Sequence, residues 1–319
     1  MAQQHPAAIQ LADDLWAIDV FHQGQPGVIA SYLLTGPAGA ALVDVGPGAA
    51  VPRLLAGIRA AGVEPASIEH LVLTHIHLDH AGATGTLLRQ LPRARAYVHR
   101  IGAPHLISPE RLVASAWRIY GEAMETLWGE ILPVPAERLV EMEEGMTLPV
   151  GQRELRVLYT PGHAVHHVAF HDQRANVVFA GDVAGVRLAG AGAVRPPTPP
   201  PDLSLEDWEV SITRVEALDP RALYLAHFGP VEEVATHLAA LRTRLRAWAE
   251  LALAGMRAGE TAETIAERLA ADLDQMIQAL PPEERAEALR RVELASNHLM
   301  SAQGFVRYFT KHHAELLAG

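Results

Sequence analysis

Short apolar runs alternate with helical stretches along the first 230 residues of the chain. The runs are rich in Val, Ile, Leu and Ala and are bounded by Gly, Pro or Asp, which is typical of buried β-strands. In chain order they are LWAIDV, VIASYLL, AALVDVG, HLVLTH, ARAYVH, LRVLYTPG, NVVFAGD and ALYLAH. Residues 50–62 show helical spacing between them, and residues 110–129 form a longer helical insertion that interrupts the alternation. The pattern predicts an α/β fold.

The pattern changes near residue 231, beyond which the strand-like runs stop. A stripe of apolar residues then recurs at helical spacing: Val234, Leu238, Leu241, Leu245, Trp248 and Leu251. Two more helices are expected, one opening near Thr261 and one after Pro281 that breaks at Gly304. We therefore expect an α/β domain over residues 1–230 and an all-helical domain over residues 231–319. The helical domain would act as a lid or as the contact of a homodimer.

A proline-rich stretch, RPPTPPPD, covers residues 195–202. Proline fixes φ and lacks an amide proton, so this stretch suits neither a helix interior nor a central strand. We expect a stiff, extended loop on the surface. The more specific alternative is a docking motif for domains that bind proline-rich segments.

The amino-acid composition limits the kinds of partner and of metal site that we expect for this chain. The 319 residues carry a net charge of −11, and their basic residues are scattered, which disfavours nucleic acid and fits a small-molecule substrate. Cysteine is absent, so disulfides and thiolate metal sites are excluded. No apolar run approaches the roughly 18 residues of a membrane span, and the amino terminus lacks the pattern of a signal peptide. We expect a cytoplasmic protein with no membrane contact.

Residues 75–80, HIHLDH, follow a strand-like run and contain four potential metal ligands. In an extended segment His75 and His77 lie on the same side, and the turn after Leu78 can bring Asp79 and His80 to a neighbouring position. Such an arrangement suits two metal ions.

Three later runs also end at a potential ligand. His163 follows LRVLY within TPGH, Asp182 follows NVVF within AGD, and His227 follows ALYL within AHFG. With the first motif, these positions supply five histidines and two aspartates.

The motif HxHxDH, followed in order by PGH, GD and a final His, resembles the metallo-β-lactamase superfamily, and specifically its glyoxalase II and lactonase-like branches. The resemblance covers roughly residues 15–229. It implies a four-layer αβ/βα sandwich with the site at one edge. It also implies one metal ion held by His75, His77 and His163, a second held by Asp79, His80 and His227, and Asp182 as the bridge between them.

Further residues are candidates for supporting roles. Asp44 ends a strand where relatives carry an aspartate that supports the site, and His166 and His167 could orient ligands or touch substrate. Glyoxalase II has a motif similar to PGHTxGH, whereas this chain has PGHAVHH. Asp79 is the candidate for passing a proton to the leaving group.

Imidazole and carboxylate ligands suit zinc, with iron or manganese as alternatives. The resulting hypothesis is a binuclear hydrolase whose metal-bridging hydroxide attacks an ester, lactone or thioester. The main alternative is an oxidoreductase of the persulfide dioxygenase type, which uses one iron on the same fold. A nuclease of the tRNA-processing branch is disfavoured by the acidic charge, and a non-catalytic relative is expected to have lost ligands, whereas the ligand set here is complete.

Overall fold

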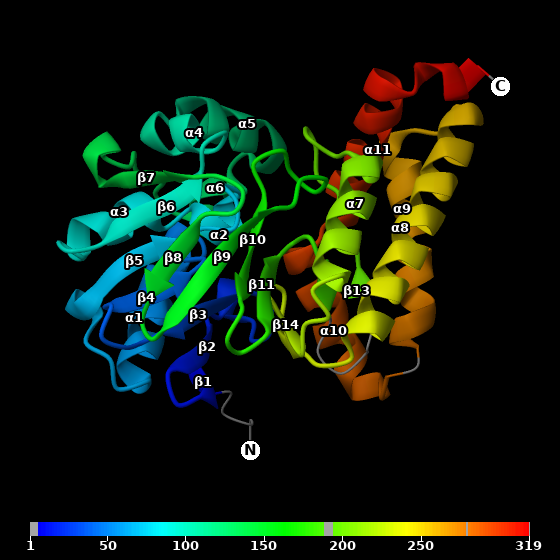
Figure 1. Ribbon diagram of the computed structural model, residues 1–319. Coiled ribbons are helices and arrows are strands. Elements are labelled where there is room, and N and C mark those ends of the chain that lie inside the picture. Colours follow the sequence, from blue (N-terminus) through cyan, green and yellow to red (C-terminus); the bar gives the residue numbers. More distant parts are fainter. Residues whose placement is uncertain (1–5, 188–193, 279, 319) are drawn as a thin grey trace. The chain divides into compact units, whose positions relative to one another are not determined.

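The computed structural model describes residues 6–187, 194–278 and 280–318, which belong to two compact units (Figure 1). The first unit comprises Met1–Tyr159 and His166–Gly181, and the second comprises Thr160–Val165 and Asp182–Gly319. The domain boundary expected at residue 230 stays a prediction.

A seven-stranded sheet in the order β1 to β7 lies in the first unit. The strands from β1 to β4 pair antiparallel, whereas those from β4 to β7 pair parallel. Their bounds are Ala8–Ala12, Leu15–Asp19, Ala30–Leu34, Ala40–Val43, Ile68–Val72, Arg95–His99 and Leu139–Met142. Because parallel strands end at the same edge of a sheet, the residues that follow β4 and β5 meet there. These residues include Asp44 and the motif that begins at His75.

Four antiparallel strands of the same unit, β8 to β11, are arranged in consecutive order. They span Thr147–Val150, Arg153–Tyr159, Val168–Asp172 and Val177–Gly181. Strands β10 and β11 are buried along their whole length, and Phe170 pairs with Phe179 across them. Burial on both faces explains why the sequence shows a continuous apolar run at β11. Strand β10, VAFHD, ends in two polar residues and was not among the predicted runs.

The helices of the first unit connect these strands. They are α1 (Val51–Ala60), α2 (Leu78–Ala81), α3 (Thr84–Gln90), α4 (Ala103–Ile107), α5 (Glu110–Tyr120) and α6 (Ala123–Trp128). Single 3-10 turns lie at His22–Gly24, Gly48–Ala50, Pro65–Ser67 and Ala136–Arg138. The insertion predicted as one helix is therefore two, α5 and α6, because the chain turns at Gly121 with φ of 51°. Trp128 and Met124 of α6 are buried against Leu78 of the HIHLDH motif.

The second unit contains two short antiparallel pairs and a set of helices. Its strands are β12 (Val186–Arg187), β13 (Val194–Arg195), β14 (Ala222–Leu225) and β15 (Gly229–Val231). Its helices are α7 (Leu205–Glu216), α8 (Val234–Arg257), α9 (Ala262–Ile277), α10 (Pro282–Ala295) and α11 (His298–His312), followed by a 3-10 turn at Ala314–Ala318. Helices α8, α9 and α11 pack against one another (Figure 1). Among the described helices, none has the combination of length and apolarity that crossing a bilayer requires.

Two expectations about the second unit are wrong. Helix α11 runs unbroken through Gly304, and the break lies before it at Ser296 and Asn297, where the Asn297 side chain accepts a hydrogen bond from the Met300 amide. The proline-rich stretch is not a surface loop over its first half, because residues 194–198 are buried. Its contacts with α8 and α11 explain both observations and are described below.

Candidate metal centre

The HIHLDH motif follows β5 and enters the short helix α2. The His75 Nε2 atom lies 2.9 Å from His77 Nδ1, and the planes of the two rings are nearly perpendicular, at 81°. On its other side, His75 Nδ1 lies 3.0 Å from the Thr74 hydroxyl. Thr74 was not among the sequence candidates; its position directly before His75 was the available signal.

Asp44 connects β4 to this motif within the first unit. Its carboxylate accepts hydrogen bonds from the Thr74 amide at 2.8 Å and from the Thr74 hydroxyl at 2.8 Å. The same carboxylate lies 2.9 Å from His80 Nδ1, which turns His80 Nε2 toward Asp79 Oδ2 at 3.6 Å. Asp44 thus contacts the imidazole of a candidate ligand and fixes the orientation of its ring.

His166 and His167 lie beside the first histidine of the motif. The His166 ring stacks on His75 with centroids 6.1 Å apart and planes 13° apart, and the His167 ring lies 5.0 Å from His75. Both side chains are buried. A Cβ at Gly181, where φ is 49°, would lie 2.7 Å from His167 Nε2 and 2.8 Å from Thr74, so a glycine is required just before Asp182.

The second unit brings His163, Asp182 and His227 together. One Asp182 oxygen lies 3.4 Å from His163 Nε2, and the other lies 3.6 Å from His227 Nε2. All three side chains are buried. Gly162 lets the backbone before His163 approach α7, since a Cβ there would lie 2.3 Å from Trp208.

His163 has a defined tautomer. Its Nδ1 atom lies 2.8 Å from the Pro197 carbonyl oxygen. Because a carbonyl only accepts hydrogen bonds, Nδ1 carries the proton and Nε2 is the ring atom that faces Asp182. No sequence signal pointed to this contact, because the partner is a main-chain atom.

The distances within each unit fit metal coordination. Two ligand atoms bound at about 2.0–2.1 Å to a tetrahedral zinc ion lie roughly 3.3 Å apart. The separations between candidate ligand atoms are 2.9 Å for His75 and His77, 3.6 Å for Asp79 and His80, and 3.4 and 3.6 Å from Asp182 to its two histidines. The longer three exceed ordinary hydrogen-bond lengths. The donor chemistry and spacing therefore suit shared cations.

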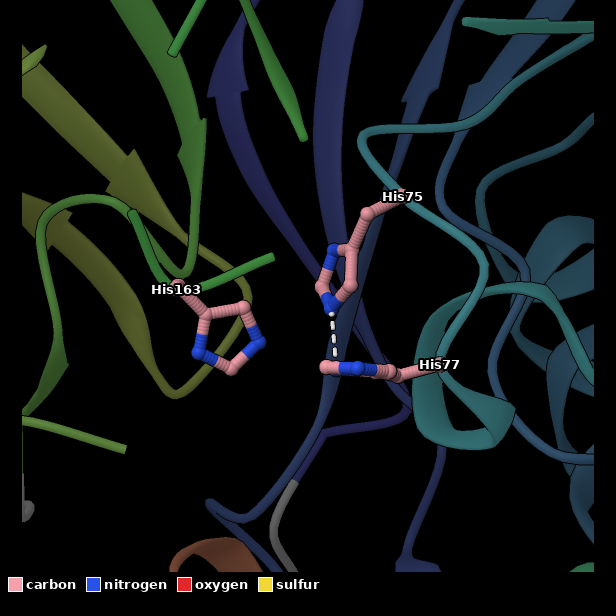
Figure 2. A group of neighbouring side chains, drawn as sticks. All are labelled: His75, His77 and His163. Atoms are coloured by element: carbon pink, nitrogen blue, oxygen red, sulfur yellow. Dashed lines mark hydrogen bonds between the residues drawn. The ribbon is translucent and has the colours of Figure 1, made fainter. Parts of the chain in front are cut away.

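Among the described residues, three groups of side chains have ligand atoms within 4.8 Å of one another and could hold a metal ion. They are His75, His77 and His163; His75, His80 and Asp182; and Asp79, His80 and His227. Figure 2 shows the first group, with the dashed contact between His75 and His77. Every ligand expected from the sequence occurs in at least one group.

Asp79 and His77 are half-buried, unlike the other candidate ligands. The Asp79 side chain is 20% exposed, whereas that of His80 is fully buried. Tyr120 of the insertion packs against the cluster that contains Leu78 and Trp128. Burial raises the pKa of Tyr120, and the negative charge of Asp79 raises it further. The phenol therefore keeps its proton at neutral pH.

Comparison with known proteins gives one family and several relatives. A model described as the metallo-beta-lactamase superfamily matches residues 24–227. A metallo-beta-lactamase fold-containing protein of Sulfurisphaera tokodaii is 30% identical over 159 residues, which are 49% of this chain and 59% of that protein. A hydroxyacylglutathione hydrolase of Maricaulis maris is 34% identical over 89 residues, which are 28% of this chain and 32% of that protein. The match thus covers less than two thirds of either relative.

Solved structures share the fold. A metallo-beta-lactamase family protein from Thermus thermophilus matches with a TM-score of 0.72 and 25% identity over 96% of both chains. A subclass B3 metallo-beta-lactamase of Bradyrhizobium japonicum matches with a TM-score of 0.54 and 20% identity, covering 75% of this chain and 92% of that one. The fold class expected from the resemblance, including its helical C-terminal extension, is confirmed.

Proposed function

Because this chain belongs to the metallo-β-lactamase superfamily, we propose that it is a binuclear metal-dependent hydrolase acting on an ester, lactone or thioester. The observation that carries the proposal is the position of Asp182, whose two carboxylate oxygens face two different histidines. A carboxylate in that position suits a bridge between two cations. The similarity to part of a protein named hydroxyacylglutathione hydrolase supports a hydrolytic reaction.

The proposed ligands divide into two sets that share one residue. They are His75, His77 and His163 for the first ion, Asp79, His80 and His227 for the second, and Asp182 for both. Zinc fits these donors best, with iron and manganese as alternatives. When bound, two such ions make hydroxide available near neutral pH and polarise the carbonyl oxygen of the substrate.

The side chains around the ligands have separate tasks in this proposal. Asp44 and Pro197 orient the rings of His80 and His163 through their Nδ1 atoms. Asp79, the more exposed carboxylate, would accept the proton of the attacking hydroxyl group and pass it to the leaving group. Asp79→Asn should therefore lower kcat more than it lowers metal content; an Asp79→Asn enzyme with full metal and full activity would remove this role.

The decisive experiment combines elemental analysis of the purified protein with hydrolysis assays on lactones, thioesters and carboxylic esters. We expect about two equivalents of zinc or manganese per chain and turnover of at least one carbonyl substrate. Asp182→Asn is the matched variant, because it keeps the shape of the side chain and removes the bridging charge. It should lose both metal and turnover.

The opposite result defines the alternative. One iron per chain together with oxygen consumption on a persulfide substrate would replace the hydrolase by an oxidoreductase on the same fold. Zinc with no turnover of any carbonyl ester would leave the metal site and overturn the substrate class.

A further inference from the structure

The proline segment, defined as residues 194–201, contacts two C-terminal helices of the second unit, α8 and α11, and its residues 194–198 are buried. Arg195 is fully buried, and its guanidinium lies over the ring of Trp248 in α8, 5.2 Å from the ring centroid. Arg244, also in α8, donates a hydrogen bond from Nη1 to the Val194 carbonyl oxygen at 3.0 Å. Arg244 is itself fixed by Asp272 at 3.1 Å. The amino end of the segment is therefore fastened to α8.

Helix α11 contacts the carboxyl end of the proline segment. The Thr198 hydroxyl donates to the Ser301 carbonyl oxygen at 3.2 Å, and Arg307 Nε donates to the Pro201 carbonyl oxygen at 3.2 Å. At Gly304 the helix and the segment approach so closely that a Cβ would lie 1.8 Å from the Thr198 carbonyl oxygen. Glycine is thus required in the middle of α11 by packing, although it weakens a helix by about 1 kcal/mol relative to alanine.

The segment makes one contact with a proposed ligand. Between its two fastened ends, the Pro197 carbonyl oxygen accepts the hydrogen bond from His163 Nδ1 at 2.8 Å. This bond fixes the tautomer in which Nε2, 3.4 Å from Asp182, is the atom available to a metal ion. The prolines at 196 and 197 limit backbone rotation beside this carbonyl, which suits a rigid acceptor.

We propose that helices α8 and α11 position His163 for metal binding by holding the Pro197 carbonyl against its Nδ1 atom. The C-terminal helices thus act on the proposed metal centre indirectly, because they hold the proline segment whose Pro197 carbonyl contacts His163. The part that concerns zinc affinity rests on the proposed metal site, whereas the part that concerns the tautomer does not.

The test uses Gly304→Ala in the full-length protein. The added methyl group favours the helix but collides with the Thr198 carbonyl, so any effect on His163 must come through the proline segment. Gly255→Ala in α8 is the matched control, because its Cβ would lie 2.5 Å from the Glu260 side chain and 2.9 Å from the Ile265 side chain, neither of which belongs to the proline segment. Thr198→Val is a milder second variant that removes only the hydrogen bond to Ser301.

Two measurements decide the outcome. Long-range proton–nitrogen NMR of histidine-labelled, metal-free protein reports the tautomer of His163, whose signals are assigned by their loss in His163→Gln. Competition titration with a chromogenic chelator reports the affinity for zinc. We expect the wild type and Gly255→Ala to hold the Nδ1–H form, and Gly304→Ala to populate the Nε2–H form and lose about tenfold in zinc affinity. Thr198→Val should shift the His163 tautomer and lower the zinc affinity in the same direction as Gly304→Ala, but by a smaller amount.

Retention of the Nδ1–H form and of wild-type zinc affinity in both Gly304→Ala and Thr198→Val would overturn the proposal. If Gly304→Ala does not fold, Thr198→Val decides alone. Should the wild type bind none of zinc, manganese and iron, the proposed function fails while the NMR comparison still decides whether the helices set the His163 tautomer.

Discussion

The carboxylate of Asp44 accepts hydrogen bonds from Thr74 and lies against His80 Nδ1, so one side chain orients two neighbours of the proposed metal site. Its φ of 54° lies in the left-handed region, which asparagine also tolerates. Asp44→Asn therefore keeps the backbone, removes the charge that stabilises the His80 ring, and replaces one of the two acceptor oxygens with an NH2 donor, so a contact to Thr74 or His80 is lost. We expect zinc affinity to fall about 10- to 100-fold in a chelator competition titration. Asp13→Asn, at an exposed position, is the control and should bind zinc like the wild type.

The candidate ligands could be selected from the sequence because each has a side chain that can bind a metal ion and lies at or just after the end of a strand-like run, and the structure brings them together in three groups. Their supports were predictable only in part. Asp44 was found as a carboxylate at the end of a strand, but the Thr74 hydroxyl and the Pro197 carbonyl have no comparable signal. A threonine occurs in many environments, and almost any residue could supply a main-chain oxygen. Tertiary structure alone selects these partners.

The free energy of unfolding should depend on pH through His237, which is not one of the proposed metal ligands. Burial lowers its pKa below the ordinary 6.5, the charge of Arg187 lowers it further, and the hydrogen bond from Nε2 to the Ala184 carbonyl opposes both. When the pH falls below 6.5, the unfolded chain binds a proton at His237 before the folded chain does. The free energy of unfolding therefore decreases from about pH 6.5 down to the folded pKa.

His237→Gln removes this proton while an amide can still donate to Ala184. Urea denaturation of the metal-free protein at about pH 7 and about pH 5 should show a smaller loss of stability for His237→Gln than for the wild type. His312→Gln, at an exposed position, should lose as much as the wild type. Equal losses in all three proteins would contradict the effect of burial at His237.

At the scale of elements, helices α5 and α6 contain two tryptophans in opposite environments. Trp128 is 6% exposed and packs with Leu78, whereas Trp117 is 51% exposed. Trp128→Ala should lower the free energy of unfolding by about 3–5 kcal/mol, because it leaves a cavity beside the metal-binding motif. Trp117→Ala should change it by less than about 0.5 kcal/mol. Chemical denaturation of both variants measures the difference, and equal effects would be inconsistent with this packing.

Helices and loops also show which predictions from sequence patterns were correct and which were wrong. The apolar stripe predicted α8 correctly, because helical spacing is a local property of the sequence. The break at Gly304 was wrong, since this glycine accommodates the Thr198 carbonyl within an intact helix. The surface position predicted for residues 195–202 was wrong for residues 195–198, because proline content indicates an extended chain but does not show that two helices cover it.

For the whole molecule, the proposed ligands span positions 75 to 227, so metal binding would tie together segments that are far apart in the sequence. A ligand that binds only the folded state stabilises it by RT ln(1 + [L]/Kd), which is about 2.7 kcal/mol when the free ligand is at 100 times Kd. Removal of the metal should therefore lower Tm by roughly 5 °C or more. Scanning calorimetry with and without a chelator measures the change.

The variant Asp182→Asn distinguishes stabilisation by metal ions at the proposed site from other effects of the chelator. Its carboxamide retains the shape beside His163 and His227 but lacks the charge for cation binding. The variant should melt at the same temperature with and without the chelator, and added zinc should raise Tm only in the wild type. A chelator effect of equal size in both proteins would mean that the stabilising ion lies elsewhere. A shift confined to the wild type would link the stability of the fold to Asp182 and to the cations proposed beside it.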